Sequence, residues 1–186
     1  MRSYAGRGVG AHFINDLFLA EKYVYVVSRW ISPEYARKLV EKAESGVEVK
    51  VLTSDDSEKS HQESLKILLD ALKPPKLAFF RKSWTPVNME LGVIREKYLH
   101  VKMYVWDRGA AVGSANFTQN GMWHNIEHII VFDKQEEIEA IKKDFNTLWT
   151  LYTEDKETAK EVITLFDIAK KIGKPLSELK KLFRKE

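Results

Sequence analysis

Runs of apolar residues, either continuous or alternating with polar ones, indicate where strands and helices lie along the chain. Strands rich in β-branched and aromatic residues are predicted over residues 23–28, 47–52, 77–80, 99–106, 110–113 and 126–132. Apolar residues at helical spacing predict helices over residues 13–20, 33–43, 63–72 and 136–152. A strand, a helix and a second strand in succession build a parallel or mixed sheet. We therefore expect an α/β fold with a mixed sheet flanked by helices.

Three segments lack a clear periodicity. Gly6, Gly8 and Gly10 indicate an irregular start, and residues 55–61 indicate a polar loop. Residues 84–97 are expected to form a long excursion, a feature that is often functional in compact domains.

The pattern changes after residue 152. We expect one domain over residues 1–152 and a short helical tail over residues 153–186. In the tail, Ala169, Gly173 and Leu179 have the spacing of a helix-turn-helix. Two interpretations remain open. The tail either packs on the domain or on a dimer mate, or it binds DNA through its lysines and arginines.

Composition excludes several classes of protein. The 186 residues contain no cysteine, which rules out disulfides, cysteine-based zinc sites and a cysteine nucleophile. No apolar run reaches the roughly 18 residues of a membrane span, and the N-terminus has no signal-peptide pattern. We therefore expect a cytoplasmic protein without stable membrane insertion. The net charge of +3 permits a polyanionic partner without requiring one.

Polar side chains interrupt the apolar pattern where two predicted strands form a hairpin. His100 and Lys102 lie two residues apart and share one face of a strand, and Ser114 and Asn116 do the same. Glu127 begins the next strand and is expected to reach the same cluster. One surface of the sheet would then present an imidazole, an ammonium, a hydroxyl and an amide.

The hairpin loop determines how these side chains oppose one another. A three-residue loop is predicted over residues 107–109, with Gly109 in the left-handed conformation. This loop predicts three directly opposed pairs, which are Trp106 with Ala110, Lys102 with Ser114, and His100 with Asn116.

The cluster suits chemistry at a phosphoryl group. An imidazole acts as a nucleophile or a general acid and base near neutral pH. Ammonium and amide donors bind non-bridging oxygens and stabilise the charge that develops on them. A carboxylate behind the imidazole orients it and stabilises its cationic form. The arrangement requires no metal and no other cofactor.

The stretch from His100 to Glu127 resembles the phospholipase D superfamily, in particular its single-motif endonuclease-like branch. It contains the pattern His-x-Lys-x-x-x-x-Asp, followed by Gly-Ser-x-Asn and Asn-x-Glu. The matching residues are His100, Lys102, Asp107, Gly113, Ser114, Asn116, Asn125 and Glu127. The similarity extends over residues 11–152 and implies a phospholipase D-like fold.

The resemblance also implies a metal-independent phosphodiesterase. His100 would attack phosphorus and form a phosphohistidine, which water resolves, while a second histidine protonates the leaving group. Lys102 and Asn116 would bind the phosphate. Ser114 would support that site, and Glu127 would orient His100.

Asp107 completes the motif and is expected to be a structural partner of its loop. The chain holds one motif, whereas the family builds its site from two, so we expect a homodimer whose symmetry axis passes through the site. The preferred substrate is nucleic acid, either DNA or RNA. The alternatives are a lipid phosphodiesterase of phospholipase D type and a catalytically weak protein that binds nucleic acid.

Other polar and aromatic side chains have plainer interpretations. His124 and His128 flank Glu127 in the manner of a metal-binding pair, but no third ligand is evident, so a solvated or supporting role is favoured. His12 and His61 are expected to lie at the surface or to have a structural role. Candidates for stacking bases or lining a groove for a polyanion are Trp84, Trp123, Arg81, Lys82, Arg95 and Lys97.

Overall fold

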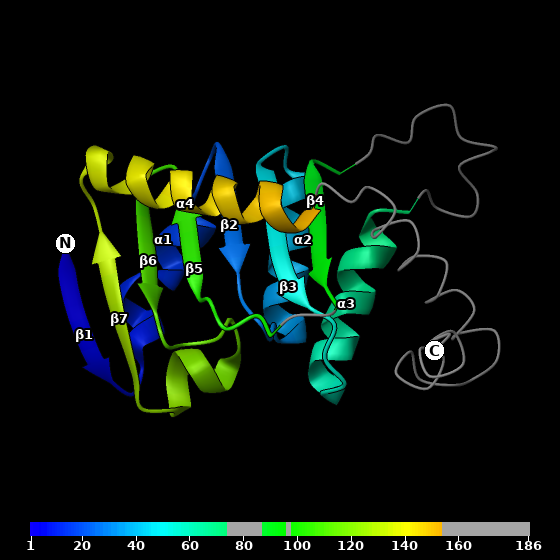
Figure 1. Ribbon diagram of the computed structural model, residues 1–186, viewed down its shortest axis with the longest axis horizontal. Coiled ribbons are helices and arrows are strands. Elements are labelled where there is room, and N and C mark those ends of the chain that lie inside the picture. Colours follow the sequence, from blue (N-terminus) through cyan, green and yellow to red (C-terminus); the bar gives the residue numbers. More distant parts are fainter. Residues whose placement is uncertain (74–86, 96–97, 154–186) are drawn as a thin grey trace.

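A seven-stranded mixed sheet forms the centre of the computed structural model, which describes residues 1–73, 87–95 and 98–153 (Figure 1). The order across the sheet is β1-β7-β6-β5-β2-β3-β4. The pairs β2–β3 and β3–β4 are parallel, and all other neighbours are antiparallel. The strands are β1 (Arg2–Gly6), β2 (Tyr23–Val27), β3 (Glu48–Ser54), β4 (Met89–Ile94), β5 (Met103–Trp106), β6 (Gly109–Gly113) and β7 (Glu127–Phe132).

Helices cover both faces of the sheet. The helix α4 (Gln135–Thr153) runs across one face, as Figure 1 shows, and α1 (Ile14–Phe18) and α2 (Pro33–Glu44) lie behind the other. The helix α3 (Lys59–Ala71) packs beside α2. Two short helices, η1 (Val9–His12) and η3 (Asn120–His124), contact each other.

Each face of the sheet has its own hydrophobic core, as the alternation of side chains along the strands requires. On the side of α1, α2 and α3, Tyr104 and Trp106 are fully buried, and Phe13 stacks on both rings with centroid separations of 5.3 and 6.1 Å. On the α4 side, Phe145 stacks on Tyr25 with ring centroids 4.8 Å apart, and Ile138 is buried beside it. Both cores consist of buried side chains in mutual contact, so they hold the ends of the strands in fixed positions.

The expected α/β class and mixed sheet are confirmed, including the unit that runs from β2 through α2 to β3. Two strands were not anticipated. β1 forms within the glycine-rich start because its backbone pairs with β7. β4 forms within the expected excursion because residues 89–94 pair with β3, although Gly92 weakens the strand pattern.

The helix α3 begins at Lys59, inside the segment that was expected to be a polar loop. The carboxylate of Glu58 accepts hydrogen bonds from the backbone N–H groups of Ser60 (3.1 Å) and His61 (2.6 Å). This cap satisfies donors that the first helical turn leaves unpaired, so the helix starts earlier than its apolar pattern.

The predicted hairpin register is wrong by one residue. Trp106 pairs with Gly109, so the turn contains Asp107 and Arg108 alone, and β5 begins at Met103 instead of Leu99. Gly109 does not have a positive φ angle. Instead, a Cβ atom at this position would lie 2.4 Å from the indole ring of Trp106. Glycine is needed here for close packing and not for a left-handed turn.

The predicted strand over 77–80 and the tail from residue 154 onward lie outside the described residues. In the part of the chain that is described, no helix is both long and apolar enough to cross a bilayer.

Candidate active site

Five polar side chains come together along one edge of the sheet, where the carboxyl ends of β2, β3 and β6 meet the amino ends of β5 and β7. In the spatial order of the strands from β7 to β3, they are Glu127, Ser114, Lys102, Arg29 and Asp56. Each lies at the end of its strand or just beyond it. These ends of the strands form the lower edge of the sheet in Figure 1. We call these five residues the edge row.

His100 and Lys102 precede β5 and differ in their surroundings. His100 is exposed, and its ring stacks on that of Tyr98 with a centroid separation of 5.6 Å. Lys102 is buried, with 5% of its surface exposed. Its ammonium donates a hydrogen bond of 2.7 Å to the backbone carbonyl of His100. The cation is therefore fixed directly beneath the segment that presents the imidazole to solvent.

Burial lowers the pKa of Lys102, because desolvation disfavours the ammonium. The carboxylate of Glu127 opposes this effect, and the positive charge of Arg29 adds to it.

Ser114 and Glu127 are joined across the β6–β7 pair. The hydroxyl of Ser114 donates to Glu127 Oε2 and accepts a bond of 3.0 Å from the backbone N–H of His128. The side-chain amide of Asn125 donates to Glu127 Oε1 at 3.3 Å. These bonds hold the carboxylate at the start of β7. Its hydrogen bonds go to Ser114 and Asn125, whereas the sequence predicted that it orients His100.

Asn116 lies in a segment that is tied to the loop after β2. The backbone carbonyl before it, that of Ala115, accepts a bond of 2.6 Å from the Tyr104 hydroxyl. The backbone N–H after it, that of Phe117, donates to Ser28 Oγ at 2.9 Å. The Asn116 Oδ1 atom is buried and finds no hydrogen-bond partner within the described ranges. Asn116 is thus fixed at the same edge with unused hydrogen-bonding capacity.

Asp107 lies apart from this group. It is in the hairpin turn at the opposite end of β5, where its carboxylate accepts from the backbone N–H of Glu21 at 3.3 Å. The neighbouring Arg108 forms an ion pair of 2.8 Å with Asp16. This position agrees with the expected structural role in the loop.

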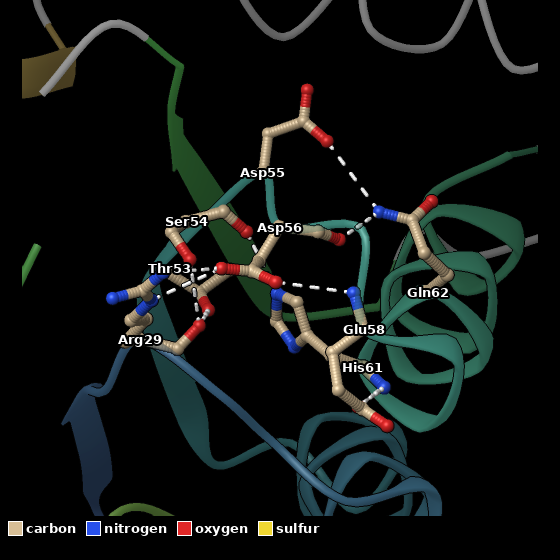
Figure 2. Close-up of polar contacts among 8 residues, drawn as sticks. All are labelled: Arg29, Thr53, Ser54, Asp55, Asp56, Glu58, His61 and Gln62. Atoms are coloured by element: carbon tan, nitrogen blue, oxygen red, sulfur yellow. Dashed lines mark hydrogen bonds and ion pairs between the residues drawn. The ribbon is translucent and has the colours of Figure 1, made fainter. Parts of the chain in front are cut away.

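Arg29 and Asp56 belong to the edge row, but sequence reasoning did not single them out. Figure 2 shows the Arg29 guanidinium directed at Asp56, with its Nε and Nη2 atoms 3.0 and 2.7 Å from Asp56 Oδ2. Burial raises the pKa of Asp56, but the hydrogen bonds from Arg29 and from the Glu58 backbone outweigh it and lower the pKa overall. A signal did exist in the sequence, since Arg29 immediately follows a predicted strand and Asp56 lies in the polar loop after the next one.

His61 anchors the start of α3 beneath this pair. Its imidazole is fully buried and accepts from the Ile31 backbone N–H at 3.1 Å through Nδ1. Its Nε2 atom lies 2.7 Å from the carbonyl of Ser54, a residue drawn beside it in Figure 2. Burial lowers its pKa. These buried contacts fit the structural role that was expected for His61.

The remaining candidates lie elsewhere or outside the description. His124 ends η3 and is exposed, while His128 lies in β7 and bonds Ser3 Oγ at 2.8 Å, so the two do not share a strand. No group of three potential metal ligands occurs among residues 1–73, 87–95 and 98–153. Trp123 donates to the Tyr35 hydroxyl at 2.8 Å and packs on the core, and Arg95 follows β4. Outside the description are Arg81, Lys82, Trp84 and Lys97.

A mixed seven-stranded sheet flanked by helices is the architecture of a phospholipase D-like domain. The family described as "Cardiolipin synthase, PLD-like domain" matches residues 13–149, which include the whole edge row. The chain therefore belongs to this phospholipase D-like family. Membership places it in a superfamily of phosphodiesterases. Among curated proteins, a search with the sequence finds no match.

Solved structures share the fold at low sequence identity. Nuc from Salmonella typhimurium, a phospholipase D family member, superposes with a TM-score of 0.61 at 14% identity, covering 80% of this chain and 94% of its own. NucT from Helicobacter pylori gives 0.56 at 16% identity, covering 78% and 92%. Phosphatidylserine synthase from Haemophilus influenzae gives 0.50 at 13% identity, covering 90% of this chain and 45% of its own. At these identities the likeness concerns the fold alone.

Proposed function

We propose that the chain is a metal-independent phosphodiesterase that cleaves DNA or RNA through a covalent phosphohistidine on His100. One observation carries the proposal. The exposed imidazole of His100 lies beside a buried lysine whose ammonium is bonded to the His100 carbonyl at 2.7 Å. This reaction requires a nucleophile that the substrate can reach and a fixed cation that binds the phosphate oxygens.

The reaction has two steps. A ring nitrogen of His100 forms a bond to phosphorus, and the bond from phosphorus to the leaving oxygen breaks. A second histidine gives its proton to that oxygen. Water then attacks phosphorus, the phosphorus–nitrogen bond breaks, and the water proton returns to the second histidine. Lys102 and Asn116 bind the non-bridging oxygens, and Ser114 and Glu127 support this site.

The second histidine is supplied by another copy of the chain. The described residues contain one motif of this type, so a homodimer with its twofold axis through the site would bring two copies of His100 to one phosphate. A mass measurement in solution tests this part separately. A monomer with full activity would refute it.

Nucleic acid is preferred over lipid because of the charge at the site. Arg29 and Lys102 present two cations on neighbouring strands, and a polyanion gains from both. The names of two structural relatives, Nuc and NucT, agree with this preference. The family's own description names cardiolipin synthase, so a lipid phosphodiester is the alternative substrate.

The test compares wild type with His100→Ala in excess EDTA. Substrates are single- and double-stranded DNA, RNA, and vesicles of phosphatidylcholine or cardiolipin. Cleavage of nucleic acid that survives EDTA and is lost in the variant supports the proposal, and His12→Ala, an exposed histidine elsewhere, is the matched control. Cleavage confined to the vesicles, or loss with EDTA alone, overturns it.

A further inference from the structure

Arg29 is a cation of the edge row to which the proposed mechanism gives no role. It follows β2, and 20% of its side-chain surface is exposed. Two of its nitrogen atoms, Nε and Nη2, donate to Asp56 Oδ2. A guanidinium has five N–H groups in a rigid planar fork, and no residue in the described part of the chain accepts from the others.

Aromatic rings fix the orientation of this guanidinium. Its central carbon lies 4.1 Å from the ring centroid of Tyr98 and 4.8 Å from that of Trp30. In both contacts the positive charge is attracted to the face of the ring, which stabilises the guanidinium in this position. Tyr98 also stacks on His100, so Arg29 is linked through one ring to the proposed nucleophile. An arginine held by an ion pair and by two rings is preorganised for a planar contact.

The charges of the edge row place two cations side by side between two carboxylates, an arrangement that suits an anion spanning both cations. Arg29 and Lys102 are adjacent cations on β2 and the approach to β5, and their repulsion is part of the lowered pKa of Lys102. The carboxylates Asp56 and Glu127 lie at the two outer ends of the row. The two carboxylates balance the two cations in total charge, but both cations lie at the centre of the row. Adjacent like charges are costly in the free protein, and bound phosphates would offset that cost.

We propose that Arg29 binds the phosphate next to the one that is cleaved, so that the substrate strand runs along the edge row from Lys102 towards Asp56. The inference rests on the proposed function. It makes Arg29 a substrate-binding residue that selects for chains with consecutive phosphates over esters with a single phosphate.

The position of Arg29 explains why the neighbouring phosphate is assigned to it. Neighbouring strands are about 4.8 Å apart, and Arg29 lies one strand away from Lys102, on the side opposite Ser114 and Glu127. Asp56 draws its side chain further from Lys102, towards β3. The guanidinium thus faces the span that the next nucleotide of a strand would occupy, while Lys102, Ser114 and Asn116 surround the reacting phosphate.

Kinetics on two substrates test the assignment. Wild type, Arg29→Gln and Arg37→Gln are compared on an oligonucleotide and on bis(p-nitrophenyl) phosphate, which has a single phosphate. Arg37 is the matched control, because it is an exposed arginine of α2 paired with Glu63 at 2.9 Å. We expect Arg29→Gln to raise KM for the oligonucleotide on the order of ten- to a hundred-fold, with KM for the small ester and kcat on both substrates unchanged.

Binding gives a readout that a merely structural role would not move. In a His100→Ala background, the affinity for a fluorescent single strand is measured against salt concentration. Loss of one phosphate contact lowers the slope of log K against log salt by about 0.7, and adding Arg37→Gln to that background should leave it unchanged. If Arg29→Gln unfolds the protein, the double variant Arg29→Gln/Asp56→Asn removes the unpaired carboxylate and serves for the same comparison.

The outcomes separate the two proposals. If wild type cleaves neither nucleic acid nor the small ester, the proposed function fails, and the assignment of Arg29 that rests on it fails as well. If wild type cleaves both and Arg29→Gln impairs them equally, or leaves both KM values and the salt slope unchanged, the assignment of Arg29 is overturned while the proposed function stands.

Discussion

His61 provides the sharpest test of how the edge row is held in place. Replacing it with alanine leaves the Ile31 N–H and the Ser54 carbonyl without the partner that each has at 3.1 and 2.7 Å. Each unpaired buried group costs about 1–3 kcal/mol, so we expect His61→Ala to lose roughly 2–6 kcal/mol of unfolding free energy, with more from the cavity. His61→Asn places an acceptor near the Nδ1 position and should lose about half as much.

The same residue predicts how stability depends on pH. Burial lowers the pKa of folded His61 below its usual value of 6.5, while nearby Asp56 and Glu58 oppose that shift. Above pH 6.5 both states are neutral and the stability is fully present. As the pH falls below 6.5, the unfolded chain takes up a proton first, and wild type loses stability by up to about 1.4 kcal/mol per pH unit until folded His61 is protonated. A proton on Nδ1 would also break the bond from Ile31.

Urea unfolding at pH 7 and pH 5 measures both effects. The loss of stability on acidification should be smaller in His61→Asn than in wild type, and the difference isolates His61 from the carboxylates that titrate in the same range. His124→Ala, an exposed histidine, is the control and should change stability by no more than about 0.5 kcal/mol. An identical pH dependence in wild type and His61→Asn would refute the reasoning.

Three further predictions concern the site. Because the pKa of Lys102 is lowered by burial, the alkaline fall in kcat/KM should occur below pH 10.5, and it should move to higher pH in Lys102→Arg, since arginine stays charged. In Gly121→Ala the new Cβ atom would lie 2.4 Å from the Asn116 carbonyl oxygen, so we expect a loss of about 1–3 kcal/mol in urea unfolding and a fall in kcat on the order of ten-fold or more. Asp107→Asn should leave kcat/KM unchanged and cost at most about 1 kcal/mol, because Asp107 lies at the far edge and bonds the Glu21 backbone; a large loss of activity would contradict that placement.

Local patterns predicted the central elements of the fold correctly. The strand 23–28 and the helix from Pro33 onward could be identified because apolar side chains repeat with the period of the element that buries them. β1 and β4 escaped prediction because each depends on backbone pairing with a distant strand. Both strands contain a glycine, which has no side chain and therefore interrupts the pattern from which a strand is predicted.

The candidate site divides in the same manner. His100, Lys102, Ser114, Asn116 and Glu127 could be found from spacing and from family resemblance. Their pairing could not, because the one-residue difference in the turn depends on whether the Trp106 ring covers Gly109, which is a matter of packing. Arg29 and Asp56 lie 27 positions apart. Their contact follows from the parallel pairing of β2 with β3, which aligns the carboxyl ends of both strands.

The β2–β5 ladder joins two halves of the edge row, and each half is expected to fold separately. Arg29 and Asp56 come from β2 and β3, which a single helix connects, and the other three members come from the β5–β6–β7 meander. Each half is local in the chain, whereas the β2–β5 ladder closes a long loop and is therefore expected to form late. A transient break in that one ladder would separate the nucleophile from Arg29 while both halves stay folded. Hydrogen exchange at the amides of Tyr25 and Val105, which face each other across that ladder, would then report how often the site comes apart.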